Sequence, residues 1–235
     1  MTSDIALVTG ATAGIGRAIA WALGRAGYSV GVTARTASTV DALVEALAAE
    51  GIAAAGRAAD VADPGQVAAL LEHVAAILGP VDTLVNNAGV LIPKPFVDLT
   101  LEEWDRTFAT NVRGVAVATR AVLPGMIAAG KGDIVNVASL AGKNGVPGAA
   151  AYSAAKHAVL GFSRSLMLEV RKHGVRVIAV CPGSVDTPMM RNQSVFRPNL
   201  DQILKADDVA ATVVEALSLP RRAMVSELDI RPSRP

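Results

Sequence analysis

Apolar residues follow two alternating patterns along the chain. Short apolar runs, bounded by glycine, proline or polar residues, predict strands. Longer stretches with apolar residues three or four positions apart predict helices. The predicted strands are residues 5–9, 29–33, a run after residue 51 that ends near Asp60, 81–86, 133–139, 175–180 and 224–230. The predicted helices are residues 15–26, 39–50, 64–79, 100–129, 151–173 and 207–217.

Residues typical of helix starts support three of these helices. Asp63 and Pro64 form an N-cap followed by a first-turn proline. Thr100 and Glu103 have the spacing of a capping box, and Asp207 is expected to cap the last helix. The regular alternation of strands and helices predicts an α/β fold. We expect one doubly wound Rossmann-type domain over residues 1–235, with a parallel sheet covered by helices on both faces.

The composition fits a globular domain with an aliphatic core. Of the 235 residues, 51% are hydrophobic and 3% are aromatic. The formal net charge of +1 gives no reason to expect nucleic acid or an anionic membrane as a partner. The chain starts without a signal-peptide pattern, and no uninterrupted apolar stretch is long enough to span a bilayer, so we expect a cytoplasmic protein. The one cysteine, Cys181, lies in an apolar run and is expected to be a buried thiol.

A glycine-rich turn joins the first predicted strand to the first predicted helix. Its glycines are Gly10, Gly14 and Gly16, in the stretch "TGATAGIG". Such a turn lets the backbone approach a pyrophosphate, and the helix N-terminus adds N–H donors. The spacing is G-x-x-x-G-x-G rather than the common G-x-G-x-x-G. Turn formation alone is the alternative explanation, but the position between strand and helix favours nucleotide binding. Together with the alternation, it predicts a seven-stranded parallel sheet in the order 3-2-1-4-5-6-7.

A tyrosine and a lysine lie one helical turn apart in "YSAAK". At positions i and i+4, Tyr152 and Lys156 share a helix face. A free phenol has a pKa of about 10, and a nearby cation is expected to lower that pKa and suit the phenol to proton transfer at neutral pH. Ser139 ends the fifth predicted strand, where ligands bind in open α/β sheets, and its hydroxyl can polarise a carbonyl. The alternative is a half-buried tyrosine beside a lysine that reaches to solvent.

Five motifs together resemble the short-chain dehydrogenase/reductase family over nearly the whole chain. They are the glycine turn, "NNAG" at 86–89, "ASLAG" at 138–142, "YSAAK" at 152–156 and "CPGSVDTP" at 181–188, in the family's order. The closest resemblance is to 3-oxoacyl-carrier-protein reductase-like and carbonyl reductase members. It implies an oxidoreductase that transfers a hydride between a nicotinamide and a carbonyl or secondary alcohol.

The resemblance implies four catalytic residues: Asn111, Ser139, Tyr152 and Lys156. Tyr152 would be the general acid/base, and Lys156 would contact the nicotinamide ribose. Asn111 would distort its helix and help to hold a water near the lysine; the alternative for it is a solvated helix residue. The other cofactor contacts implied by the resemblance are Gly10, Thr12, Gly14, Ile15, Gly16, Asp60, Val61, Asn87, Ala88, Gly89, Pro182, Gly183, Val185 and Thr187.

The end of the second predicted strand favours NADP(H) over NAD(H). NAD sites usually have an acid there for the ribose 2′-hydroxyl, whereas an arginine suits the 2′-phosphate. Here no acid follows the strand before Asp41, and Arg35 offers a planar set of donors. Thr36 and Ser38 add hydroxyl donors. The alternative is that Arg35 is an ordinary solvated side chain.

A nucleotide-binding regulator and a sugar-nucleotide enzyme are the alternative functions. A regulator that binds a nucleotide without catalysis would usually lack the tyrosine or the lysine, and both are present. A sugar-nucleotide epimerase or dehydratase would be longer and would have a different glycine spacing. No metal is expected, because the three histidines lack metal-ligand spacing; we read them as helix-surface residues.

Further expectations concern the substrate and the assembly. The segment 187–206 is expected to cover an apolar-tolerant substrate pocket, with Met189, Met190, Val195 and Phe196. Arg106, Arg113 and Arg120 recur every seven residues and are expected to share a solvated or subunit-contact face rather than an acyl-carrier docking patch. The long apolar helices and the resemblance point to a homotetramer. A dimer is the alternative, because many family members have a Gly-Gly stretch and a further tail after the last strand that help to build a tetramer, whereas this sequence has "SELDIRPSRP" there. The tail "RPSRP" is expected to be loose.

Overall fold

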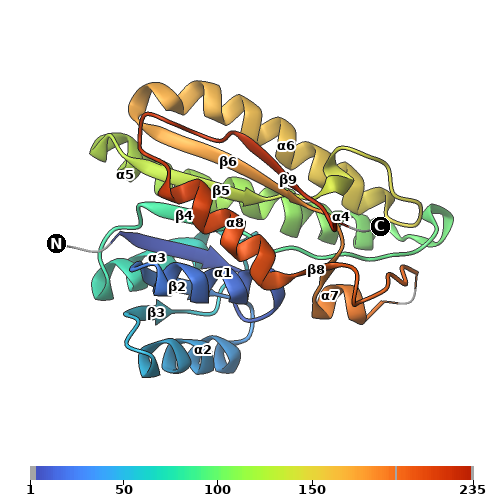
Figure 1. Ribbon diagram of the computed structural model, residues 1–235, viewed down its shortest axis with the longest axis horizontal. Coiled ribbons are helices and arrows are strands. Elements are labelled where there is room, and N and C mark those ends of the chain that lie inside the picture. The colour runs from blue at the N-terminus through green and yellow to red at the C-terminus, as the bar shows by residue number, and fades with distance from the viewer. Residues whose placement is uncertain (1–3, 194, 234–235) are drawn as a thin grey trace.

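Seven parallel strands form one twisted sheet in a computed structural model that describes residues 4–193 and 195–233 (Figure 1). The predicted strand order is confirmed. In spatial order the strands are β3 (Ala54–Gly56), β2 (Ser29–Thr33), β1 (Ile5–Thr9), β4 (Thr83–Asn86), β5 (Gly132–Val137), β6 (Val175–Pro182) and β9 (Glu227–Ile230). The seventh strand of the sheet carries the label β9 because two short strands precede it in the chain.

Helices cover both faces of the sheet, as the alternation predicted. One face is covered by α1 (Gly14–Arg25), α2 (Ala37–Ala49) and α8 (Ala206–Ser218). The other is covered by α3 (Pro64–Ile77), α5 (Gly114–Ala129) and α6 (Ala150–Val170). Neighbouring strand residues alternate between the two cores: Leu7 packs in the second and Val8 in the first. This two-sided burial explains why the strands read as continuous apolar runs.

The strand order reverses direction between β1 and β4. From β1 the chain proceeds outward to β2 and β3, and from β4 it proceeds the other way to β5, β6 and β9. In open α/β sheets, ligands bind outside the carboxyl ends of the strands at this reversal. The glycine turn after β1 and the "NNAG" segment after β4 lie at that point.

Several element boundaries differ from the predictions. Strand β3 ends at Gly56 rather than near Asp60. Beyond it, the Ala59 N–H donates to Ala34 O at 3.0 Å, so the chain still hydrogen-bonds to the segment that follows β2. Helix α8 begins at Ala206, so Asp207 is inside its first turn. Asp208 instead accepts from the Lys205 N–H at 2.8 Å. The Asp63–Pro64 start and the Thr100–Glu103 capping box are confirmed.

The predicted helix over 100–129 is continuous but not uniform. It consists of α4 (Leu101–Phe108), a π-helical turn η2 (Ala109–Arg113) and α5. The π turn breaks the regular period on which the shared face of Arg106, Arg113 and Arg120 was based. Arg113 Nε donates to Ala62 O at 3.0 Å, so that arginine contacts its own chain.

Short elements that have no strong periodic signal were missed. They are two-residue strands β7 (Val185–Asp186) and β8 (Leu204–Lys205), helix α7 (Pro188–Arg191), and the 3-10 turns η1 (Phe96–Asp98), η3 (Leu140–Gly142) and η4 (Arg171–His173). β7 and β8 pair in parallel. They join the two ends of the segment expected to cover the substrate pocket.

The stretch Leu101–Ala129 is long and apolar enough, by length and composition, to cross a membrane, with a mean hydropathy of 1.3. This differs from the sequence expectation, because Arg113 and Arg120 interrupt the run but leave its average hydropathy high. Val122 and Met126 are buried, and 33% of the apolar window lies inside the protein. Core helices of globular proteins can be equally long and apolar, so this stretch is weak evidence for a membrane span.

Candidate active site

The glycine turn is packed too tightly for any side chain at two of its positions. A Cβ at Gly10 would lie 2.8 Å from Ala88 Cα, and a Cβ at Gly16 would lie 2.3 Å from both Gly10 O and Asn87 Nδ2. Gly10 and Gly14 also have φ angles of 63° and 53°, which favour glycine. The glycines are therefore needed for close packing as well as for turn formation. The bare backbone at the start of α1 is what a pyrophosphate site requires.

Hydrogen bonds tie this turn to the "NNAG" segment. Asn87 Nδ2 donates to Thr9 O at 2.9 Å and to Gly10 O at 3.1 Å. Thr9 Oγ1 accepts from the backbone N–H groups of Asn87 and Ala88, each at 3.0 Å. Thr9 was missed by the sequence reasoning. Its signal is a hydroxyl residue at the last position of an otherwise apolar buried strand.

Replacing Gly16 by alanine is expected to destabilise the protein and weaken cofactor binding. The new methyl would meet backbone and an anchored amide, and overpacking of this kind costs about 1–3 kcal/mol. Thermal unfolding and a cofactor titration would measure both effects. Gly161→Ala is the matched control: it also lies in a helix, a Cβ there meets nothing within 4 Å, and alanine should stabilise by about 1 kcal/mol. Equal behaviour of the two variants would contradict the packing argument.

Tyr152, Lys156 and Ser139 come together at the carboxyl ends of β5 and β6. Tyr152 and Lys156 lie in the first two turns of α6, and Ser139 follows β5. Lys156 is buried; its Nζ donates to Val137 O at 2.7 Å and lies 5.6 Å from the centroid of the Tyr152 ring. Ser139 Oγ accepts from the Ala141 N–H at 3.1 Å and donates to Pro182 O at 3.5 Å, and the Ser139 side chain acts to lower the pKa of Tyr152. The sequence prediction that these side chains meet agrees with this geometry.

The expected effect of Lys156 on the Tyr152 pKa is not observed. Burial raises the pKa of Tyr152, and the hydrogen bond with Ser139 offsets only part of that rise. Burial also lowers the pKa of Lys156 to about 8. A low-dielectric surrounding disfavours every charged form, and this desolvation is the largest cause of both shifts. The phenol is therefore held in its protonated form, which can donate a proton.

Asn111 lies in the π turn η2, so the predicted distortion of its helix is confirmed. Its buried side chain pairs with the backbone of Val90: Oδ1 accepts from the N–H at 2.8 Å and Nδ2 donates to the carbonyl at 2.9 Å. Asn111 thus holds the chain just beyond the "NNAG" segment. Its predicted role in holding a water near the lysine stays a prediction.

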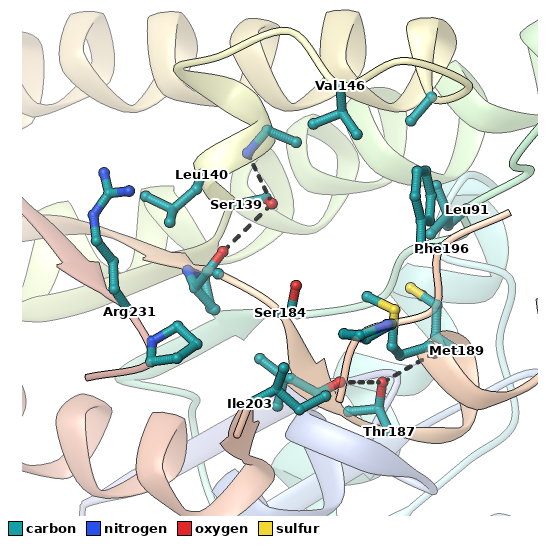
Figure 2. Close-up of a pocket in the computed structure, with 18 of the residues that line it drawn as sticks. Leu91, Ser139, Leu140, Val146, Ser184, Thr187, Met189, Phe196, Ile203 and Arg231 are labelled. Carbon is teal, nitrogen blue, oxygen red and sulfur yellow. Dashed lines mark hydrogen bonds between the residues drawn. The ribbon is translucent and has the colours of Figure 1, made fainter. Parts of the chain in front are cut away.

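Two adjoining cavities meet at Tyr152. The smaller has a volume of about 210 Å³ and extends from the glycine turn to Lys156. The larger, about 780 Å³, is also lined by Tyr152 and includes Ser139 (Figure 2). Both cavities are lined by Ile15, Ala138, Tyr152, Thr187 and Met189. A ligand that fills the small cavity would therefore present its end to a second molecule in the large one.

The predicted cofactor contacts divide into those that line these cavities and those that do not. Lining the smaller cavity are Gly10, Gly14, Ile15, Asn87, Ala88, Gly89, Tyr152, Lys156 and Thr187. Pro182, Gly183 and Val185 line the larger one. Outside both cavities are Thr12, Gly16, Arg35, Thr36, Asp60 and Val61.

The predicted cofactor contacts outside the cavities include residues that follow β2 and β3 at the carboxyl ends of these strands. Arg35 and Thr36 are exposed at the end of β2, and within the described part of the chain Arg35 has no ion pair or hydrogen-bond partner. Asp60 is exposed and its Oδ1 accepts from the Ala62 N–H at 2.9 Å. Val61 is buried against Gly114, where a Cβ would lie 2.6 Å from Val61 Cγ2. Arg35 therefore lies where its side chain could reach an extended nucleotide bound along the carboxyl ends of the strands.

The sequence reasoning also missed part of the larger cavity wall. Leu91, Val146, Arg231 and Pro232 line it. The tail expected to be loose is therefore ordered at residues 231–233, whereas 234–235 lie outside the described residues. No local pattern in "RPSRP" indicates contact with a cavity, because that contact depends on where β9 ends.

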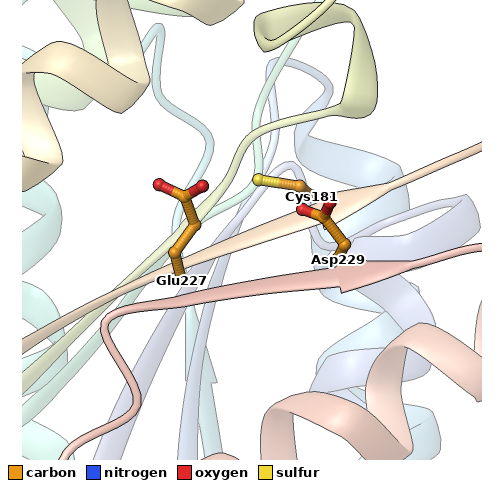
Figure 3. A group of neighbouring side chains, drawn as sticks. All are labelled: Cys181, Glu227 and Asp229. Carbon is orange, nitrogen blue, oxygen red and sulfur yellow. The ribbon is translucent and has the colours of Figure 1, made fainter.

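A cluster of Cys181, Glu227 and Asp229 has its possible ligand atoms within 4.8 Å of one another (Figure 3). Lys143 Nζ forms ion pairs with both carboxylates, at 2.5 Å to Glu227, and Arg164 also pairs with Glu227 at 3.0 Å. Cys181 is buried as predicted, and burial raises the pKa of its thiol to about 11. Protein cations already compensate the carboxylates, so we interpret the cluster as structural.

Comparison with known proteins agrees with this geometry. The family model described as short chain dehydrogenase matches residues 4–197. A ketoacyl reductase of the monensin polyketide synthase from Streptomyces virginiae is 48% identical over 190 residues, covering 80% of this chain and 73% of that relative. A 3-oxoacyl-[acyl-carrier-protein] reductase from Synechocystis is 39% identical over 232 residues, covering 96% and 94%. A solved structure of an actinorhodin polyketide ketoreductase variant with NADPH has a TM-score of 0.90 at 37% identity, covering 98% and 96%. Because the family match includes the glycine turn, Asn111, Ser139 and the tyrosine–lysine helix, the chain belongs to the short-chain dehydrogenase family.

Proposed function

We propose that the protein is an NADP(H)-dependent oxidoreductase that transfers a hydride between the nicotinamide and a carbonyl or secondary alcohol. The observation that carries this proposal is the meeting of two cavities at Tyr152, one leading from the glycine turn and one open to a substrate. The relatives named as ketoacyl reductases, and the solved relative with NADPH, support the same activity.

The residues along the cleft fit a nicotinamide dinucleotide. The close-packed glycines leave the backbone N–H groups at the start of α1 open to a pyrophosphate. Lys156, Asn87 and Thr187 line the cavity that continues from there. Arg35 and Thr36 would receive the 2′-phosphate, because Arg35 is exposed and lacks a protein partner within the described residues. The bound nicotinamide would supply the hydride.

The side chains around Tyr152 would orient the substrate and move the proton. Ser139 can donate a hydrogen bond to the substrate carbonyl and polarise it. Tyr152, whose pKa is raised by burial, is protonated and can donate its proton to the oxygen as the carbonyl is reduced. Lys156 is fixed by its hydrogen bond to Val137 O, which holds its ammonium in the cofactor cavity that Tyr152 also lines. The protonated phenol would act as the acid when a carbonyl is reduced, and the phenolate would act as the base when an alcohol is oxidised.

A panel of ketones and aldehydes would test the proposal. Reduction is expected with NADPH, followed as the loss of the absorbance of the reduced nicotinamide. A cofactor that binds without turnover of any carbonyl or alcohol would overturn the enzymatic proposal and favour the alternative of a regulator on the same fold.

We also propose that the segment 187–206 covers the substrate cavity of a single domain that spans residues 1–235. Met190, Phe196 and Ile203 line the cavity; residue 194 lies outside the described residues. Asp186 holds the two ends of the segment, because its carboxylate accepts from Arg191 at 2.5 Å and from Lys205 at 3.1 Å. The chain in between supplies the side chains that would contact a substrate.

A homo-oligomer is expected in solution, a tetramer ahead of a dimer. Around α4, large apolar side chains are exposed: Val97 at 91%, Leu101 at 76% and Phe96 at 63%. Exposed apolar groups of this size are typical of protein–protein contacts. Light scattering at micromolar concentration should give a multiple of the 24.0 kDa chain mass. A particle of the single-chain mass would contradict this prediction.

We propose a cytoplasmic location as well. The single cysteine has no second cysteine in the chain with which to form a disulfide, and its thiol is buried. A reducing compartment suits this composition. Fractionation of the native host would test the proposal.

A further inference from the structure

The chain's own C-terminal tail forms part of the substrate cavity. The Gly183 N–H, beyond β6, donates to Ile230 O at 2.8 Å. A Cβ at Gly183 would lie 3.3 Å from Pro232 Cδ, so the tail runs closely along this side of the cavity. Arg231 and Pro232 therefore line the same 780 Å³ space as Ser139 and Tyr152.

The charged side chains that line this cavity within the described chain are all cationic. Its charged lining residues are Arg197 and Arg231, and no carboxylate lines it within the described chain. The remaining lining side chains are mostly apolar, with Ser184, Asn199 and Gln202 among the polar ones. Within the described chain Arg197 has no ion-pair partner, and Arg231 shares the carboxylate of Asp229. A cation beside an apolar wall favours an anion, because a paired cation offsets part of the cost of removing a carboxylate or phosphate from water.

Arg231 is held in place without being fully neutralised. Its guanidinium pairs with Asp229 at 3.2 Å. Asp229 also pairs with Lys143, which in turn pairs with Glu227, and Glu227 pairs with Arg164. The network thus contains three cations and two carboxylates, which leaves one positive charge over. A guanidinium also has donors for two acceptors at once.

Ser139 lies between Arg231 and two apolar side chains of the cavity wall. Figure 2 shows Arg231 on one side, near Leu140, and Phe196 and Leu91 on the other side, with Ser139 between them in this view. A substrate whose carbonyl is at Ser139 and Tyr152 could direct a charged end toward Arg231 and an apolar end toward Phe196.

We propose that the substrate carries, besides its carbonyl, an oxyanion that Arg231 binds. The group is a carboxylate on a small oxo acid or a phosphate on an acyl carrier, which have the same recognition chemistry. The proposal rests on the proposed function for the carbonyl chemistry and adds the substrate class and a specificity-determining residue.

Matched substrate pairs test this proposal. Pyruvate, acetoacetate and levulinate are each compared with their methyl esters, and acetoacetyl-coenzyme A is compared with the acetoacetyl thioester of N-acetylcysteamine, which lacks phosphate. The parent protein should prefer the anionic member of at least one pair. In Arg231→Gln that preference, as a ratio of kcat/KM values, should fall about tenfold, because a charge-assisted bond is worth at least about 1.4 kcal/mol. Turnover of the neutral member should change little.

Arg164→Gln is the control, because Arg164 belongs to the same ion-pair network and does not line the cavity. Its preference should match that of the parent. An equal fall in both variants, or equal losses for charged and neutral substrates in Arg231→Gln, would reduce Arg231 to a structural residue and overturn the proposal. If the preference for the anionic substrate falls only in Arg197→Gln, the assignment to Arg231 is overturned. The substrate pair whose preference falls in Arg231→Gln shows whether the bound oxyanion is a carboxylate or a phosphate.

A binding measurement separates this proposal from the proposed function. Calorimetric titration with hexanoate and hexanol requires no turnover. Arg231→Gln should weaken hexanoate binding, or binding of inorganic phosphate, about tenfold and leave hexanol binding unchanged. If no carbonyl is reduced but this result holds, the oxidoreductase proposal fails and the anion site stands. If carbonyls are reduced and neither anion binds through Arg231, the anion site fails alone.

Discussion

Tyr152→Phe is expected to remove nearly all turnover while leaving cofactor binding largely unchanged. The ring stays in place, and its contacts in both cavities are kept. What is lost is the exchangeable proton, which the raised pKa of Tyr152 keeps on the phenol. General acid–base groups contribute about 10²–10⁴-fold to rate, on the order of 3–5 kcal/mol. Steady-state turnover of the best carbonyl substrate would measure the loss, and fluorescence titration with NADPH would measure binding.

Tyr28→Phe is the matched control, because the chain has two tyrosines and Tyr28 lines neither cavity. It should retain turnover. Lys156→Ala, by contrast, should impair both turnover and cofactor binding, because the Lys156 ammonium lines the cofactor cavity and is anchored on Val137 O. Turnover by Tyr152→Phe close to that of the parent would disprove the acid/base assignment.

Arg35→Asp is expected to abolish or reverse a preference for NADPH over NADH. Arg35 is exposed at the end of β2, and it has no carboxylate partner among the described residues that would have to be displaced. A charge-assisted hydrogen bond to the 2′-phosphate is worth about 1.5–3 kcal/mol, roughly 10- to 150-fold in affinity. The aspartate removes this attraction, repels the phosphate, and can accept a hydrogen bond from a 2′-hydroxyl.

The measurement is kcat/KM for both cofactors in the parent and the variant. Arg222→Asp is the control, because it makes the same charge change at an exposed arginine beyond α8. It should leave the preference intact. A parent that prefers NADH, or an Arg35→Asp variant that keeps its preference for NADPH, would show that the 2′-phosphate is bound elsewhere.

Local sequence patterns were sufficient for the architecture. Each buried strand is a short apolar run and each covering helix has an apolar stripe, so the alternation predicted a parallel sheet with two covered faces. The glycine spacing after β1 predicted the place where a nucleotide could bind. Tyr152 and Lys156 could be paired from sequence because an i and i+4 separation fixes two side chains on one helix face. Ser139 could be added because the carboxyl ends of parallel strands share one edge of the sheet.

Tertiary structure decided what depends on contacts between distant segments. The sequence could not show that burial raises the pKa of Tyr152, since desolvation depends on everything packed around a group. It could not show that Gly16 is needed for close packing against Asn87, or that Asn111 pairs with Val90. Nor could it place Arg231 in the substrate cavity. That position follows from the pairing of β9 with β6, which joins residues about fifty positions apart and has no periodic signal in the tail itself.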